Sequence, residues 1–337
     1  MEALNVAIAS DSIEITSFIP TKVILTLPQL YYLQKHNYIN VTNRKCNKRK
    51  CEEYLQFCPS KRNKADGYTA RCNKHKRYEL SIKDNSFFAQ HKISISKQIY
   101  IIDHLSQQCT TASICGLFRG KVYRETVTKI LNELHQLMKP IVFNSKPQFD
   151  ITDFIEIDEM YIDWNIPGNH DGSTIDEKLL GKSGQWLLGI INRDRTKLWV
   201  EPIKNRGKKE IFRVLNSIMP KGKANVFTDA LTTYAELDHN HVHFVINKAK
   251  QGFGRKSYRL ITGGKFIKSK RIFERLKKEK AEWIVKVHVN FIENNWMLLR
   301  KFLVVRQAYR HPHLLINYLA EFIFNFYKHN WLDLLKL

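Results

Sequence analysis

Three carboxylates have neighbours that suggest a chemical role, and the first is Asp158. It lies in FIEIDEMYI, whose alternating apolar residues predict a β-strand. In a strand, Glu156, Asp158 and Met160 face one side, and an acid between apolar residues needs a partner or a cation. The alternative is an acid at the end of a strand that is simply solvated.

The second carboxylate is Asp229, which ends the apolar strand ANVFTD just before a predicted helix. Open sheets place functional groups at the carboxyl ends of their strands. The competing interpretation is that Asp229, or Thr228 beside it, only caps the helix that follows.

The third carboxylate, Glu293, lies in VHVNFIENNWMLLRKFL, which predicts an amphipathic helix. Helical spacing gives a buried stripe and beside it a mostly polar one. The buried stripe consists of Ile292, Trp296, Leu299 and Leu303, and the neighbouring stripe of Asn290, Glu293, Met297 and Arg300. Taken alone, Glu293 could be an ordinary solvent-facing acid.

Together, two acids from strands and one from a late helix can converge on a pair of divalent cations. Carboxylate oxygens suit Mg²⁺ or Mn²⁺. Such a pair activates a water or a 3′-hydroxyl for in-line attack on a phosphodiester and stabilises the leaving oxygen. We therefore expect Asp158, Asp229 and Glu293 to be catalytic and metal-binding residues, with Asn290 and Arg300 contacting DNA beside them.

A second candidate metal site lies in residues 44–77, which hold four of the six cysteines, twelve basic residues and three acids. Tetrahedral zinc takes four Cys or His ligands. The predicted set is Cys46, Cys51, Cys72 and His75, with Cys58 as a spare or substitute. The alternatives are a ribbon that folds without metal, or free thiols in a basic loop.

The charge of the whole chain indicates a polyanionic partner. Its 337 residues include 55 Lys and Arg against 32 Asp and Glu, a net charge of +23. Nucleic acid is the first candidate and an anionic membrane the second. No window approaches the roughly 20 apolar residues of a membrane-spanning helix, and the first residues lack a secretory pattern. The uneven cysteines favour reduced thiols and an intracellular protein.

The elements that would position these residues follow from periodicity. Residues 95–105, 110–118 and 123–138 predict three helices, and Arg124 and Lys129 on the third could enter a major groove. An ordinary three-helix core is the alternative. After a Pro-punctuated linker at 139–150, a β-β-β-α-β-α order predicts a mixed sheet covered by helices, in the α+β or α/β class.

A basic segment interrupts this order, with thirteen Lys and Arg against two Glu in residues 248–280. Interleaved aromatic residues favour DNA contact over a merely solvated face, and the run could also serve nuclear import. The DNA-contacting candidates are Lys248, Arg255, Lys256, Lys270 and Arg271.

Residues from about Asp153 to Tyr327 resemble the catalytic domain of the Merlin superfamily of DDE transposases and related bacterial insertion-sequence transposases. The resemblance rests on IDE at 157–159, LLGIINRDRTKLWVEPI, FTD at 227–229, HFVINKAKQGFG, and NFIE at 290–293 followed by Trp296 and Arg300. YLQKHNYI, the cysteine cluster, DGYTARC and SIKDNSFF resemble the segments that precede this domain. The chain departs from the family pattern at Ala230, where members have Gly, and in its longer basic segment.

The resemblance implies an RNase H-like catalytic domain at 150–330 with a basic insertion at 248–287. Before it would come a helical segment at 1–40, a zinc-ribbon-like module at 41–92 and a helix-turn-helix-like DNA-binding domain at 93–140. The implied activity is cleavage at the terminal inverted repeats of a mobile element and joining to target double-stranded DNA, by a homo-oligomer on DNA. The expected location is the nucleus of a eukaryotic host, otherwise the cytoplasm or nucleoid. The alternatives are a retired, transposase-derived DNA-binding protein and a host nuclease.

Overall fold

The computed structural model describes residues 24–63, 65–164, 184–219, 222, 224–247, 255–260, 266–267 and 281–336. Contacts divide the chain into two compact units. One comprises the chain up to Leu137 together with His329–Leu337, and the other comprises Met138–Lys328. Each unit is described by itself below.

The first described elements of the N-terminal unit are a short helix and a small antiparallel sheet of order β1-β2-β3. Pro28 at the start of the helix fits the fixed φ of a first turn. The β1–β2 ladder runs from the pair Leu55–Cys72 to the pair Pro59–Tyr68. The elements are α1 (Leu27–Lys35), β1 (Leu55–Pro59), β2 (Tyr68–Cys72) and β3 (Glu79–Leu80).

Three helices follow: α2 (Ile95–Ser106), α3 (Thr111–Leu117) and α4 (Arg124–Asn144). The Ser94 and Thr110 side chains cap α2 and α3 by accepting backbone N–H groups. Gly120 turns the chain before α4 with a φ of 75°. The three helices predicted for this region are therefore present.

The predicted linker at 139–150 is wrong over its first half, because α4 continues through Pro140 to Asn144. Proline removes one backbone donor and leaves the carbonyl four residues earlier without its usual partner. Both Pro140 and Gln136 are exposed, so water can satisfy that carbonyl. Beyond the proline, Val142 is buried, and the Phe143 ring meets Trp199 edge-on at 5.7 Å, which anchors the end of the helix.

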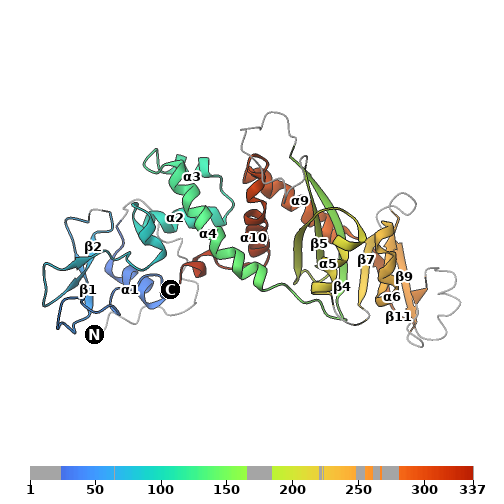
Figure 1. Ribbon diagram of the computed structural model, residues 1–337, viewed down its shortest axis with the longest axis horizontal. Coiled ribbons are helices and arrows are strands. Elements are labelled where there is room, and N and C mark those ends of the chain that lie inside the picture. The colour runs from blue at the N-terminus through green and yellow to red at the C-terminus, as the bar shows by residue number, and fades with distance from the viewer. Residues whose placement is uncertain are drawn as a thin grey trace. The chain divides into compact units, whose positions relative to one another are not determined.

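The second unit is built on a five-stranded mixed sheet of order β6-β5-β4-β7-β8. Strands β4, β5 and β6 are antiparallel neighbours, whereas β7 and β8 run parallel to β4. Figure 1 shows β4, β5 and β7 side by side. The strands are β4 (Phe154–Asp163), β5 (Gly184–Asn192), β6 (Leu198–Ile203), β7 (Asn225–Asp229) and β8 (Val242–Ile246).

Helices pack against this sheet: α9 contacts β4 and β5, while α5 and α10 contact β6. The predicted mixed sheet with packed helices is therefore confirmed. The helices are α5 (Lys208–Ile218), α6 (Leu237–Asn240), α9 (Asn290–Val305) and α10 (Leu315–Phe326). Between α9 and α10, the buried Arg306 guanidinium pairs with the buried Glu321 carboxylate.

The basic insertion contains a second antiparallel sheet, of order β10-β9-β11, that the sequence patterns did not predict. Its strands are β9 (Arg255–Leu260), β10 (Phe266–Ile267) and β11 (Ala281–Val287). Within the described part of the chain, no helix combines the length and apolar character needed to cross a bilayer.

Candidate functional site

Asp158 and Asp229 occupy equivalent positions on neighbouring parallel strands. The β4–β7 ladder pairs Ile155 with Val226 and Glu156 with Phe227. Asp158 comes two residues after Glu156, and Asp229 comes two residues after Phe227. Because side chains alternate between the two faces of a strand, each acid faces the same side as that earlier residue. Adjacent strands lie about 4.8 Å apart, so the register brings the two carboxyl groups to neighbouring places in the sheet.

Asp158 is buried, with 8% of its surface exposed, so the interpretation as a solvated strand-end acid is wrong. The indole Nε1–H of Trp296, on α9, donates to Asp158 Oδ2 at 3.2 Å. Gly189, the β5 partner of Asp158, permits this approach. A Cβ at Gly189 would lie 2.4 Å from Trp296 Cη2 and 2.8 Å from Ile292 Cδ1. The helix thus packs onto the strand at the level of Asp158.

Glu156, two residues before Asp158 on the same face, anchors the beginning of α9. Its Oε2 accepts the backbone N–H groups of Phe291 at 2.8 Å and Ile292 at 3.2 Å. These are among the N–H groups that a helix start leaves without intrahelical partners. Arg193 Nε donates to Glu156 Oε1 at 3.0 Å. Burial raises the pKa of Glu156 against the opposing effects of Arg193 and the two backbone donors.

Glu293 lies in the first turn of α9, between its two anchors on β4. The predicted stripe of Ile292, Trp296, Leu299 and Leu303 is buried, which confirms the helical phase. Glu293 and Asn290 are half-buried, so Glu293 is not a fully solvent-facing acid. Arg300 is exposed two turns further along the helix.

Asp229 is followed by a short segment tied to the opposite face of β4. Asp229 Oδ1 accepts the backbone N–H of Leu231 at 3.0 Å, and the 3₁₀ helix Thr232–Glu236 follows without a side-chain cap. Asp229 therefore does not cap the helix that follows, as the alternative interpretation expected, but forms a hydrogen bond within the turn that precedes it. In the 3₁₀ helix, the buried Tyr234 hydroxyl donates to Glu159 Oε1.

The buried Glu159 side chain forms the centre of a polar network beside the two aspartates. Arg206 donates to Glu159 Oε2 through Nη2 at 2.9 Å and Nε at 3.1 Å, and the Glu159 side chain is 1% exposed. Burial raises the pKa of Tyr234, and the charges of Glu159, Asp158 and Asp229 raise it further. The network fixes the segment after Asp229 against β4. Strand alternation puts Glu159 on the face opposite Asp158, but no local sequence pattern predicts its contacts with Tyr234 and Arg206.

The three carboxylates do not form a tight cluster like that of the sulfur ligands described next. Among the described residues, the only group of three or more candidate ligand atoms within 4.8 Å of one another is formed by cysteines and a histidine. A two-metal site does not require such a cluster. Two ions about 4 Å apart, with oxygen ligands at about 2.1 Å, allow outer oxygens to lie roughly 8 Å apart.

The four predicted zinc ligands come together at one end of the β1–β2 hairpin. Cys46 Sγ and Cys72 Sγ each lie 3.6 Å from His75 Nδ1, and Cys51 Sγ lies 3.7 Å from Cys72 Sγ. In tetrahedral zinc, with Zn–S about 2.3 Å and Zn–N about 2.0 Å, the expected separations are about 3.8 Å for S···S and about 3.5 Å for S···N. The cluster could therefore bind a metal such as zinc. Cys58 lies outside it.

Hydrogen bonding favours a thiolate in this cluster. Burial raises the pKa of Cys72, but hydrogen bonds from the backbone and side chain of His75 and from the other two cysteines outweigh it and lower the pKa to about 7. A thiolate is the form that binds a metal. Burial raises the pKa of Cys46, and hydrogen bonds with Cys72 and Cys51 add to the rise.

The remaining predicted DNA contacts are distributed over both units. Arg124 and Lys129 are exposed on the first two turns of α4. The structure assigns Arg255 and Lys256 to β9, where they pair with Val287 and Lys286 of β11. Lys248, Lys270 and Arg271 lie outside the described residues.

Comparison with known proteins gives no match: no family model fits the chain, and no curated protein matches it.

Proposed function

We propose that the protein is a DNA transposase of the DDE type, acting on the terminal inverted repeats of a mobile element. The observation that carries the proposal is the equivalent position of Asp158 and Asp229 on neighbouring parallel strands, with α9 anchored on the same strand. An RNase H-like fold is part of this proposal, and the mixed sheet supports it. Double-stranded DNA is the partner, the active form is a homo-oligomer on DNA, and the nucleus or nucleoid is the location.

In this proposal Asp158 and Asp229 hold two Mg²⁺ or Mn²⁺ ions from the sheet, and Glu293 holds them from the helix. Carboxylates are the hard oxygen ligands that such ions prefer. Bound there, the ions supply activation of the attacking water or 3′-hydroxyl and stabilisation of the leaving oxygen. Trp296 fixes one Asp158 oxygen, and Glu156 fixes the start of the helix that carries Glu293.

Nicking of labelled element ends tests the role of the carboxylates. We expect Mg²⁺-dependent or Mn²⁺-dependent nicking that is lost in Asp158→Asn while DNA binding survives. Asp163→Asn is the matched control, because Asp163 is an exposed aspartate on the same strand. If Asp158→Asn nicks as well as the parent, the metal assignment is wrong. Binding of the element ends without cleavage in either metal would favour a retired, transposase-derived DNA-binding protein.

We propose that Cys46, Cys51, Cys72 and His75 bind one Zn²⁺ that closes the N-terminal module. Elemental analysis of the purified chain should find one zinc per chain. Cys51→Ala should lower this value to near zero. Cys58→Ala is the matched control and should keep its zinc, because Cys58 lies outside the cluster. Equal zinc loss in both variants would contradict the assignment.

A further inference from the structure

Both turns that carry the sulfur and nitrogen ligands are built almost entirely from cations. The first is CNKRKC at 46–51 and the second is CNKHKR at 72–77, and within these two segments every residue other than the ligands is Asn, Lys or Arg. The six basic side chains are all exposed: Lys48, Arg49, Lys50, Lys74, Lys76 and Arg77.

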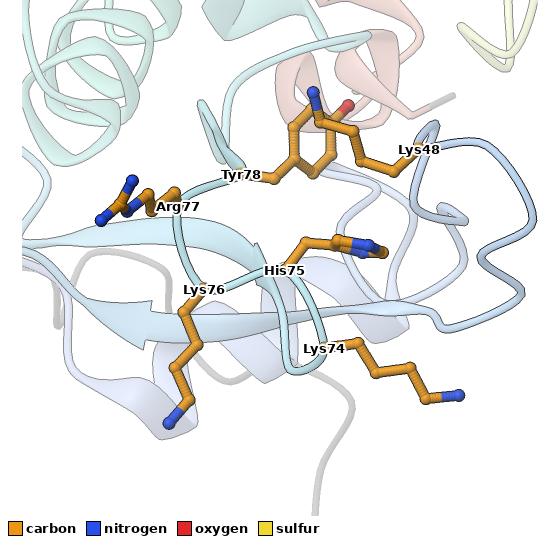
Figure 2. Close-up of a pocket in the computed structure, with 6 residues that line it drawn as sticks. All are labelled: Lys48, Lys74, His75, Lys76, Arg77 and Tyr78. Atoms are coloured by element: carbon orange, nitrogen blue, oxygen red, sulfur yellow. The ribbon is translucent and has the colours of Figure 1, made fainter.

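The two turns enclose a pocket of about 480 Å³ lined by Lys48, Tyr78 and the run Lys74 to Arg77. Lys48 Nζ lies 5.5 Å from the centre of the Tyr78 ring. Figure 2 shows Lys74, Lys76 and Arg77 extending from one turn in different directions, with Lys48 reaching across beside Tyr78. This spread fits a ligand with several phosphates along its length better than a single free phosphate.

The negative charges nearby are fewer than the cations. Glu52 is exposed beside Cys51, and Glu53 Oε1 pairs with Lys74 Nζ at 2.9 Å in an exposed ion pair. A zinc ion with three thiolates carries a net charge of about −1. The six cations of the two turns exceed these charges, so the surface attracts a polyanion when the metal site is loaded.

Most of the contacts between the two turns are made by the four candidate ligand side chains. The last β1–β2 pair is Leu55 with Cys72, and the turns lie beyond it. The contacts that span them are the sulfur and nitrogen ligand atoms, the Lys48–Tyr78 stacking and the exposed Lys74–Glu53 pair. An exposed ion pair stabilises a structure by only about 0–1 kcal/mol. A bound metal would therefore contribute most of the interaction that holds the two turns together.

We propose that these two turns form a metal-coupled surface that binds the phosphate backbone of double-stranded DNA. The choice of DNA rests on the proposed function. The surface contacts phosphates without reading bases, because its donors are flexible exposed cations. Metal binding holds the cations of both turns in one arrangement, so loading the cluster tightens DNA binding.

Binding of a fluorescent duplex of arbitrary sequence to the full-length, zinc-loaded chain tests this, without added Mg²⁺ so that cleavage plays no part. The test variant is Lys76→Ala with Arg77→Ala. Losing two phosphate contacts should weaken binding about tenfold and reduce the salt slope by roughly 2. Zinc content is measured in parallel to establish that the variant keeps its metal.

The matched control is Lys61→Ala with Arg62→Ala, which removes the same two residue types from exposed positions at the other end of the hairpin. It should bind within about twofold of the parent. Removing zinc with a chelator should weaken DNA binding by the parent at least as much as the Lys76 and Arg77 changes do, because the cations of both turns lose their common arrangement. Equal losses in both double variants, or unchanged affinity after zinc removal, would overturn the proposal.

Two further outcomes separate this inference from the proposed function. If single-stranded RNA binds this surface more tightly than duplex DNA does, the assignment of DNA is overturned. Absence of strand transfer by an otherwise intact chain would refute the transposase, but the duplex-binding comparison would still decide the role of this surface.

Discussion

Helix α9 packs closely on the sheet at Gly189, the β5 partner of Asp158. Adding one methyl group there, as in Gly189→Ala, tests whether this packing sets the positions of the carboxylates. A Cβ at this position would lie 2.4 Å and 2.5 Å from two Trp296 ring atoms, whereas ordinary contact begins at 3.4 Å. Trp296 is 3% exposed and cannot swing into solvent. The helix must therefore shift by about 1 Å. Gly189→Ala should cost about 1–3 kcal/mol of unfolding free energy.

The same shift should affect activity more than stability. A misplacement of about 1 Å can cost roughly 100-fold in rate, and Glu293 moves with the helix. Urea denaturation and the nicking assay measure the two effects. Trp296→Phe removes the indole atoms that the new methyl group would meet. The loss of unfolding free energy in the double variant Gly189→Ala with Trp296→Phe should therefore be smaller than the sum of the two single losses, by about 0.5–1 kcal/mol or more.

The matched control for this change is Gly116→Ala in α3, where an added Cβ meets no atom within 4 Å. It should leave stability unchanged or slightly higher, since alanine is the better helix former. A parent-like Gly189→Ala, or strict additivity with Trp296→Phe, would refute the packing argument.

Two more predictions concern carboxylates of the second unit, Glu159 and Glu201. Tyr234→Phe removes the hydroxyl that donates to Glu159 and should lower the unfolding free energy by about 1–3 kcal/mol in urea; a change below about 0.5 kcal/mol would contradict this. Burial raises the pKa of Glu201, but hydrogen bonds led by Arg213 and Lys146 outweigh it and hold the pKa below its ordinary value of 4.5. The ionised carboxylate therefore stabilises the fold above pH 4.5, and this stabilisation is lost as the pH falls through the lower pKa of the folded state. Glu201→Gln should flatten the acid side of a curve of unfolding free energy against pH. Parallel curves for parent and variant would contradict the ion-pair assignment.

Local patterns were sufficient to predict the strand with Asp158, the strand ending at Asp229 and the helical phase of Glu293. Each depends on alternation or helical spacing within about ten residues. The grouping of Cys46, Cys51, Cys72 and His75 was also predictable, because three cysteines and a histidine recur within one basic segment and match the residue types that zinc takes.

Long-range contacts could not be predicted in the same way. Glu156 meets the backbone of Phe291 across 135 positions, and Tyr234 meets Glu159 across 75. No local periodicity encodes such pairs. The continuation of α4 past Pro140 depends on the tertiary contact of Phe143 with Trp199, which outweighs the local preference of proline.

The most direct test of the central claim is a strand-transfer assay with Mg²⁺, using the inverted repeats that flank the coding sequence as donor DNA. The transposase proposal predicts joined donor–target products that vanish in Glu293→Gln while donor binding persists. Joined products that remain undiminished in Glu293→Gln would contradict the assigned carboxylate. Specific binding of the repeats with no joining by the parent in Mg²⁺ or Mn²⁺ would contradict the transposase itself.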